Sequence, residues 1–159
     1  MIIHFICRGN CFRSIIAEAY LNSLEVTGWS VLSSGTTAAL DKTRNLVSYR
    51  NTLALLQGHG IREFAKSGYG DLLTESRLDE TDIAICMNHR VYAECLQLVT
   101  FPAGPRIWSV ADLGEPGRIV AAESDADLYR EEVYQEIVKN VDQLVSDLLV
   151  PRGPRAGPS

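Results

Sequence analysis

The sequence contains no long hydrophobic run, and this absence excludes a membrane-spanning helix. No segment of the 159 residues approaches the roughly 20 apolar residues that a membrane span requires. The short apolar run at residues 2–6 is interrupted by Cys7 and Arg8, which is not the pattern of a secretory signal peptide. We therefore expect a cytoplasmic protein without a membrane partner.

Basic stretches and paired cysteine motifs are missing as well. The formal net charge is −5, and Lys and Arg nowhere gather into a stripe that could neutralise nucleic-acid phosphates, so no nucleic-acid partner is expected. The four cysteines are too few for a disulfide scaffold and lack the paired CxxC spacing typical of a zinc site. They are either buried apolar residues or reactive thiols: Cys7, Cys11, Cys86 and Cys95.

What is present is the pattern of one α/β domain at residues 1–150. With 46% hydrophobic residues the chain can bury one core, and short apolar runs alternate with helical patterns, which predicts a parallel sheet. The tail at residues 151–159 is rich in Pro, Gly and Arg and is expected to be disordered. The pattern predicts strands at residues 2–6, 29–32, 82–87 and 106–110, a loop at 33–36, and helices at 14–24, 46–57, 91–98 and from about Leu128 to Leu148, with Ser124 and Asp127 as a capping pair.

The segment at residues 5–14 carries the chemistry, because it joins the first predicted strand to the first predicted helix. Such a loop aims its backbone N–H groups at one point, and the helix N-terminus adds partial positive charge there. Gly9 and Asn10 permit the tight turn, and Arg13 supplies a planar fork that matches two phosphate oxygens. Ser14 can donate its hydroxyl to Cys7, which we expect to be largely thiolate and a strong nucleophile.

The sequence resembles the low-molecular-weight protein tyrosine phosphatases at this loop, whose pattern is Cys, any, Gly, Asn, any, any, Arg, Ser. Here the pattern stands as Cys7-Arg8-Gly9-Asn10-Cys11-Phe12-Arg13-Ser14. The resemblance continues at residues 17–19, 33–36, 60–61 and 78–87, and it covers roughly residues 1–150.

This resemblance implies a flavodoxin-like fold, in which four parallel strands form a sheet with helices on both faces. It also implies a phosphatase that needs no metal or other cofactor and acts on a phosphorylated protein or a small phosphomonoester. Cys7 would take the phosphoryl group, and water would then release it. The implied phosphate-binding residues are the rest of the loop: Arg8, Gly9, Asn10, Cys11, Phe12, Arg13 and Ser14.

The chain departs from the family pattern at the general acid. The family carries an Asp-Pro pair before the last helix, whereas residues 119–125 of this chain contain none. Asp125 is the first candidate for the acid and Glu123 the second, while Asp112 and Glu115 lie further upstream and could fold back into the site. The aromatic residues that flank the acid in the family have no obvious counterpart, and Arg8 adds a positive charge where the family usually has a small or apolar residue.

Two other functions remain open at this point. A thiol-dependent arsenate reductase uses the same loop in one lineage and passes oxidation to further cysteines, for which Cys86 and Cys95 are candidates. A phosphate-binding module with weak or no turnover would explain the missing Asp-Pro pair. Cys11 could trap oxidised Cys7 as a reversible disulfide, or it could be an apolar loop residue that faces the core.

Overall fold

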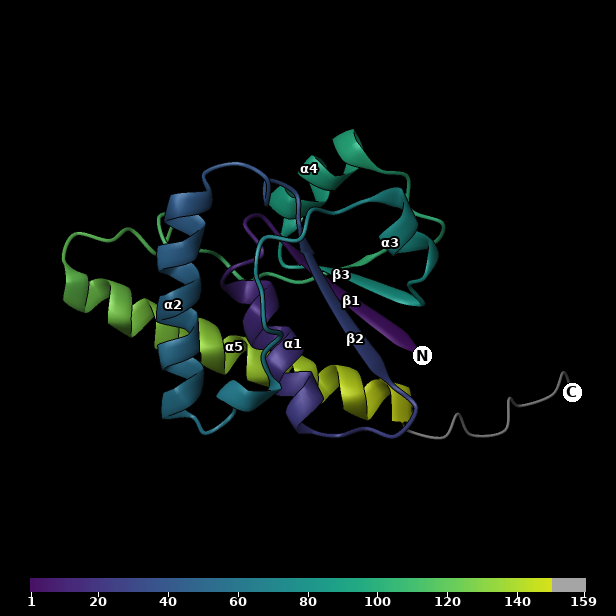
Figure 1. Cartoon of the computed structure of the whole chain (residues 1–159), viewed down its shortest axis with the longest axis horizontal. Helices are drawn as coiled ribbons and strands as arrows, with labels where there is room; N and C mark the ends of the chain where they lie inside the picture. Colours follow the sequence, from purple (N-terminus) through teal and green to yellow (C-terminus); the bar gives the residue numbers. More distant parts are fainter. Residues whose placement is uncertain (150–159) are drawn as a thin grey trace, which may run out of the picture.

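A computed structural model describes residues 1–149, which form a four-stranded parallel sheet flanked by helices (Figure 1). The strand order is β2-β1-β3-β4, so β1 lies between β2 and β3. The elements are β1 (Ile2–Cys7), α1 (Arg13–Ser23), β2 (Ser30–Gly35), α2 (Lys42–Gly58), the 3-10 helix η1 (Arg62–Phe64), α3 (Glu75–Asp79), β3 (Ile83–Cys86), α4 (His89–Leu98), β4 (Arg106–Ile107) and α5 (Glu123–Leu149).

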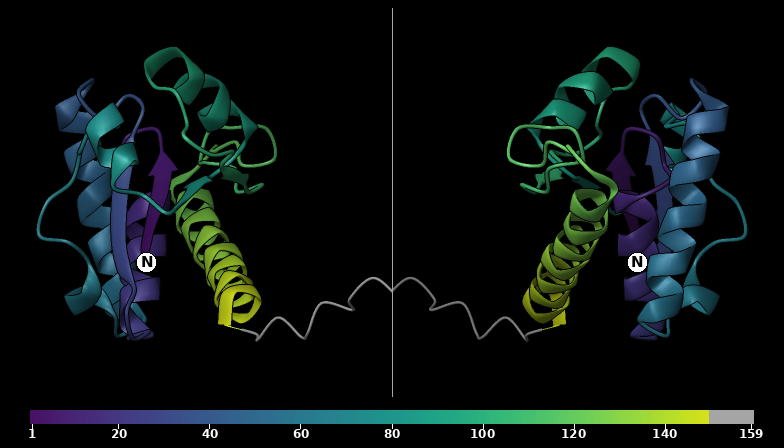
Figure 2. Two further views of the ribbon diagram at one scale, coloured as in Figure 1. Left: turned by 90° about the vertical axis from the view of Figure 1, so that its right-hand side faces the viewer. Right: turned by 90° about the vertical axis from the view of Figure 1, so that its left-hand side faces the viewer.

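The helices cover both faces of the sheet, which is seen nearly edge-on in Figure 2. α1 packs on β1 and β2 and contacts α5 on the same face, while α4 packs against β3 on the other. The burial of β1 on both faces explains its mostly apolar sequence: Ile3, Phe5 and Ile6 are fully buried, as is the one polar residue among them, His4. This arrangement confirms the predicted fold class.

The topology brings four loops together at one edge of the sheet. All pairings are parallel, so the carboxyl ends of the strands share an edge. From β1 the chain moves to β2 on one side, and from β2 it crosses back to β3 on the other side. The carboxyl end of β1 is therefore a topological switch point, where open α/β sheets bind their ligands.

The structure corrects two of the predicted strands. β2 continues to Gly35, so residues 33–35 belong to the strand and not to the predicted loop. Ser33 and Ser34 are buried there, because neighbouring polar side chains satisfy their hydroxyls. β4 has only two residues. Beyond it, isolated backbone hydrogen bonds keep the chain beside the end of β3, such as the one from the Val110 N–H to the Met87 carbonyl at 2.9 Å.

The helices also differ from the prediction in detail. α2 begins four residues earlier, because the Asp41 side chain accepts the Arg44 backbone N–H. At the start of α5 the predicted cap of Ser124 and Asp127 is wrong, since the Asp125 carboxylate accepts the backbone N–H groups that precede the helix. Leu128 is 59% exposed and not part of the core. α3 and η1 were not predicted, and residues 151–159, where disorder is expected, lie outside the described residues.

Within residues 1–149, no helix has the length and apolar character that crossing a membrane would require.

Candidate active site

The segment at residues 7–14, which joins β1 to α1 and which we call the reactive loop, surrounds the sulfur of Cys7 with hydrogen-bond donors. Cys7 is 3% exposed and ends β1, and the next residues curl back over it, with Asn10 in the left-handed conformation at φ 50°. The Asn10 backbone N–H donates to Cys7 Sγ at 3.2 Å, and Ser14 Oγ lies 2.9 Å from the same sulfur. Two donors from one loop thus favour a negative charge on this atom.

The Asn10 amide leaves the hydroxyl proton of Ser14 free for the sulfur of Cys7. Its Nδ2 donates to Ser14 Oγ and to Ser33 Oγ, both at 2.9 Å. Because Ser14 already accepts from Asn10, its own proton is available for the sulfur of Cys7. The side chain of Asn10 is fully buried, so this orientation does not compete with water.

Lys66 and Asp71 hold the other end of the Asn10 amide. Asn10 Oδ1 accepts from Lys66 Nζ at 2.6 Å and from the Asp71 backbone N–H at 2.9 Å, which completes its hydrogen bonding. Lys66 Nζ also donates to the Asp71 carboxylate at 2.7 Å. The Ser33 hydroxyl donates a hydrogen bond to the carboxylate of Glu18. Burial raises the pKa of Glu18 above its usual value, and this hydrogen bond partly offsets the rise. The reactive loop therefore rests on a fully satisfied polar network.

Arg13 is buried at the start of α1, directly beside the loop. It is 1% exposed, and its Nη1 donates to the Val110 carbonyl at 2.8 Å. Its Nη2 lies 3.5 Å from Asp112 Oδ2, and its Nη1 lies 3.7 Å from Glu115 Oε1. Nη2 has no hydrogen-bond partner among the described residues, so a buried donor remains for an anionic ligand.

The segment after β4 brings two carboxylates to this site. Asp112 is 35% exposed at its side chain, and its Oδ1 accepts the Leu113 backbone N–H at 2.8 Å. Glu115 is 12% exposed and more fully engaged, because it accepts the Asp112 backbone N–H at 2.7 Å and the Asn88 amide at 3.2 Å. We call residues 111–118 the acid loop.

The other two candidate acids lie elsewhere. The Asp125 carboxylate is bound to the Ala121 and Ala122 backbone N–H groups at the start of α5. Glu123 is 81% exposed at its side chain and pairs with Arg130 at 3.5 Å. The structure does not bring either side chain to the pocket over the reactive loop.

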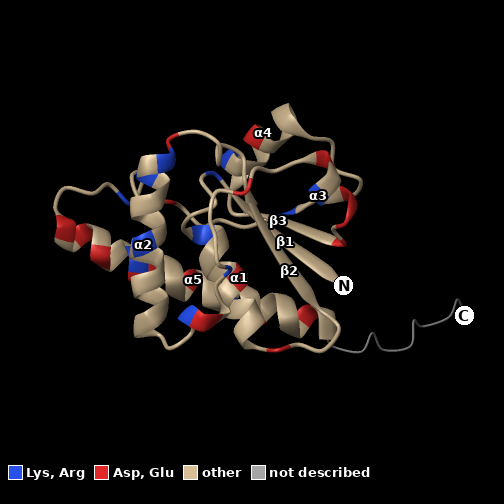
Figure 3. Ribbon diagram, viewed as in Figure 1, with Lys and Arg blue, Asp and Glu red and all other residues tan. Residues whose placement is uncertain are grey.

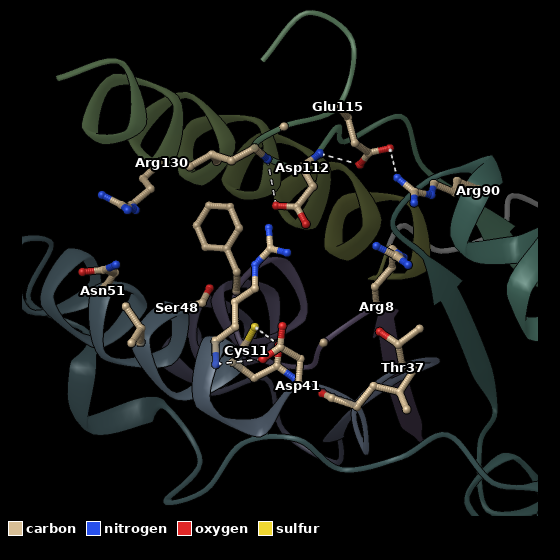
Figure 4. Close-up of a pocket in the computed structure, with 18 residues that line it drawn as sticks. Arg8, Cys11, Thr37, Asp41, Ser48, Asn51, Arg90, Asp112, Glu115 and Arg130 are labelled. Carbon is tan, nitrogen blue, oxygen red and sulfur yellow. Dashed lines mark hydrogen bonds and ion pairs between the residues drawn. The ribbon is translucent and has the colours of Figure 1, made fainter. Parts of the chain in front are cut away.

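A pocket of about 700 Å³ opens above the reactive loop, and residues from five segments line it. Figure 4 shows Asp112 pointing into this pocket, with Arg130 on one side and Arg90 and Arg8 on the other. Arg8 is tied by its Nε to Glu94 at 2.8 Å, so the loop position that departs from the family pattern is held by α4. The apolar part of the lining comes from Phe12, Leu40, Val47 and Leu113.

The cysteines outside position 7 are buried. Burial, and second the charge of Cys7, raise the pKa of Cys11 to about 12, so this thiol is a weak nucleophile at neutral pH. Cys86 and Cys95 are fully buried between β3 and α4, and their mutual hydrogen bond raises the pKa of Cys95 far above its usual range. Two fully buried thiols, one of them with a raised pKa, are poorly suited to receive oxidation from Cys7. Among residues 1–149, no group of three His, Cys, Asp or Glu side chains could hold a metal ion.

Sequence reasoning missed Lys66 and three of the pocket arginines, Arg44, Arg90 and Arg130. Lys66 stands 56 residues from Asn10, and no local motif marks it. For Arg44 and Arg90 the sequence does hold one indication. Each lies near the start of a helix that follows the carboxyl end of a strand, α2 and α4 respectively, and such residues lie at the same edge of the sheet.

Comparison with known proteins agrees with this geometry. The family model described as low molecular weight phosphotyrosine protein phosphatase matches residues 2–150. No curated protein matches the sequence significantly.

Solved structures share the fold at low sequence identity. Wzb of Vibrio vulnificus, in complex with benzylphosphonate, superposes with a TM-score of 0.69 at 16% identity, over 92% of this chain and 97% of that chain. The Drosophila arginine phosphatase gives 0.68 at 17% identity, over 96% and 100%. The low molecular weight protein tyrosine phosphatase of Streptococcus pyogenes gives 0.66 at 18% identity, over 94% of each chain.

Proposed function

Because the chain belongs to the low molecular weight phosphotyrosine protein phosphatase family, whose members are cysteine-dependent phosphatases, we propose that it hydrolyses a phosphomonoester through a cysteinyl-phosphate intermediate on Cys7. The observation that carries the proposal is the environment of Cys7 Sγ. Both the Asn10 backbone N–H and the Ser14 hydroxyl are placed to stabilise a thiolate there, at 3.2 and 2.9 Å. A thiolate at the base of an anion-binding loop is an activated nucleophile.

The proposed reaction consists of two displacements at phosphorus. In the first, the Cys7 thiolate forms a sulfur–phosphorus bond, the bond to the leaving oxygen breaks, and that oxygen takes a proton from a general acid. In the second, water attacks phosphorus and gives its proton to the same carboxylate, and the thiolate leaves. Arg13 and the loop amides hold the equatorial oxygens, where charge gathers in the transition state.

We propose Asp112 as the general acid, in place of the sequence candidate Asp125. Asp112 points into the pocket and lies 3.5 Å from Arg13 Nη2, so it is close to the phosphate position. Glu115 belongs to the same loop, but its oxygens are occupied by a backbone N–H, an amide and two arginines. The more exposed and less engaged carboxylate is the better proton donor for a leaving group.

The preferred substrate in this proposal is an aryl phosphate such as phosphotyrosine. The pocket offers Phe12 and Leu113 as apolar walls for a ring, and a structure of the same fold holds benzylphosphonate. Other structures of this fold are named arginine phosphatases, so a phosphoarginine peptide is the comparison substrate. A higher kcat/KM for the phosphoarginine peptide than for a matched phosphotyrosine peptide would contradict the aryl preference.

The mechanism is tested by rapid mixing of the enzyme with p-nitrophenyl phosphate. We expect a burst of p-nitrophenol equal to the enzyme concentration, followed by steady turnover, because with this good leaving group the intermediate forms faster than it is hydrolysed. Cys7→Ala should lose both phases, and Arg13→Ala should lose turnover. Phosphate release without any phosphocysteine in acid-quenched enzyme would contradict the covalent mechanism.

Replacement of the proposed acid should depend on the leaving group. Asp112→Asn should slow phosphorylation by phenyl phosphate about 10²-fold or more and affect p-nitrophenyl phosphate much less, because a good leaving group needs no proton. Asp125→Asn is the matched control and should leave both rates near wild type. If the two variants exchanged these phenotypes, Asp125 would be the acid.

A further inference from the structure

Arg118 is a buried charged residue at the end of the acid loop, and it has no place in the chemistry described so far. It is 7% exposed, while Asp112 and Glu115 are half-buried and Pro116, Gly117 and Ile119 are exposed. A guanidinium in such a position costs solvation energy, and an apolar side chain could fill the same space. The guanidinium, unlike an apolar side chain, supplies directed hydrogen-bond donors.

The donors of Arg118 join the acid loop to α5. Nη1 donates to the Ala111 carbonyl at 2.6 Å, which lies immediately before Asp112 in the chain. Nη2 donates to Glu136 Oε1 at 2.6 Å, and Nε lies 3.9 Å from Glu132 Oε2, both on α5. One side chain thus bridges the backbone carbonyl that precedes the proposed acid to the longest of the described helices.

The acid loop is also closed on itself, so a displacement at Arg118 is transmitted to Asp112. The Gly114 backbone N–H donates to the Arg118 carbonyl at 2.8 Å, and the Arg118 backbone N–H donates to the Glu115 carbonyl at 2.9 Å. The turns need Gly114 and Gly117, whose φ values are 87° and 88°.

Besides the ion pairs of Asp112 and Glu115 with Arg13, the loop has two polar attachments, one on each side of Asp112. On the β3 side, Glu115 accepts the Asn88 amide at 3.2 Å and lies 3.9 Å from Arg90 Nη1. On the α5 side, the attachment is the bridge made by Arg118 to Glu136. A carboxylate that must meet a leaving oxygen needs to be placed within a fraction of an ångström, and two attachments can define its position where one would leave it free to swing.

We propose that Arg118, held by Glu136, is a positioning residue that places Asp112 for protonation of the leaving group. This inference depends on the proposed function, because it assigns Arg118 a role only through the general acid. Loss of the bridge should leave the Cys7 nucleophile and the Arg13 clamp intact and should impair the proton transfer alone.

The test compares Arg118→Met and Glu136→Gln with the control Glu131→Gln. Glu131 also lies on α5 and forms a polar link, to His59 Nε2 at 2.9 Å, but that link leads to α2 and not to the acid loop. We expect Arg118→Met and Glu136→Gln to slow phosphorylation by phenyl phosphate about tenfold, with p-nitrophenyl phosphate nearly unaffected. Arg118→Lys should restore part of the rate, because it can still reach one of the two acceptors. The control should match wild type on both substrates.

A purely structural role for Arg118 would show a different result. It would lower the thermal unfolding midpoint and the rates on both substrates together, so equal losses with the two leaving groups would overturn the proposal. If Arg118→Met fails to fold, Glu136→Gln carries the same test, because it removes only the α5 end of the bridge.

Coupling to Asp112 provides the second criterion. Adding Arg118→Met to Asp112→Asn should produce no further loss with phenyl phosphate, because the group being positioned is already gone. Independent, multiplying losses would overturn the proposal. A wild-type enzyme that formed no phosphocysteine and released no phosphate would instead refute the proposed function. A burst with a normal Asp112→Asn variant would refute the choice of acid, and the role of Arg118 with it, but not the proposed function.

Discussion

His4 is a buried, uncharged histidine in the middle of β1, below the reactive loop. It is fully buried, with Nε2 2.7 Å from Ser34 Oγ and Nδ1 3.0 Å from Thr81 Oγ1. Burial, and after it the charges of Arg77 and Lys66, lowers the pKa of His4 to about 3. The folded protein therefore keeps His4 neutral at a pH where the unfolded chain would protonate it.

The sign of the pH dependence follows from this difference. Below the ordinary histidine pKa of 6.5 the unfolded state binds a proton at His4 that the folded state does not bind. The free energy of unfolding therefore falls as the pH drops from about 6.5 toward 3. We expect this one group to contribute about 1 kcal/mol per pH unit to the fall between pH 6 and pH 4. Urea unfolding across that range should show a shallower decline for His4→Gln than for wild type.

The matched control is His89→Gln. His89 is exposed at the start of α4, so its replacement should leave the slope of stability against pH unchanged. A lower overall stability of His4→Gln would be expected from its lost hydrogen bonds, and only the slope tests the prediction. Parallel curves for wild type and His4→Gln would show that His4 is protonated normally in the folded state.

At the scale of elements, the reactive loop packs directly against the end of β2, where only a residue without a side chain fits. Gly35 lies so close to the loop that a Cβ at this position would stand 2.3 Å from the Arg8 carbonyl oxygen and 2.7 Å from the Asn10 backbone nitrogen. Both are backbone atoms of the loop, and they cannot move aside as a side chain could. The Thr36 backbone N–H donates a hydrogen bond to the Cys7 carbonyl at 3.0 Å, and this bond holds the end of β2 beside the start of the reactive loop.

Gly35→Ala should therefore distort the loop without touching a catalytic side chain. A clash of this kind costs about 1–3 kcal/mol, so we expect inorganic phosphate to bind about tenfold more weakly or worse, as measured by titration calorimetry. Gly58→Ala at the end of α2 is the control, because its Cβ would meet no atom within 4 Å. Unchanged phosphate affinity in a folded Gly35→Ala variant would contradict this account.

The same scale explains which parts of the site the sequence could predict. The reactive loop is local, because residues 7–14 are contiguous. The apolar run before it predicted a strand and the pattern after it predicted a helix, and the structure contains both. Anion binding by the turn between them stays a prediction. The helices α1 and α4 were predicted within two residues, because each has a continuous pattern. β4 was overestimated, since a two-residue strand has no pattern of its own.

The acid loop could not be placed in the same way. The search for an Asp-Pro pair led to the residues before α5 and favoured Asp125, which instead caps that helix. Asp112 follows β4, and only the sheet order places it over a loop 99 residues earlier in the chain. The Arg118 bridge depends on the register of α5 against the acid loop, which no short motif encodes.

At the scale of the whole molecule, charge is distributed unevenly around the pocket. The chain carries a formal net charge of −5, yet arginines reach the pocket from the reactive loop, α2, α4 and α5. Figure 3 shows basic residues on α2 and α4, on either side of the carboxyl ends of the strands. The pocket carboxylates partly offset this charge: Asp41, Asp112 and Glu115. A dianionic substrate thus meets local positive charge in a protein that repels it at long range.

This contrast predicts how salt and a single arginine affect the rate. The pocket residue Arg44 is exposed, and its removal in Arg44→Gln should lower kcat/KM for a phosphotyrosine peptide about twofold through KM, because one exposed charge that acts through water contributes only about a few tenths of a kcal/mol. The loss should shrink as NaCl rises, since salt screens exposed charges beyond the Debye length. Arg50→Gln, exposed on α2 but outside the pocket lining, is the control and should change kcat/KM less. Equal losses from both variants would mean that net charge, and not the pocket arginine, sets the affinity.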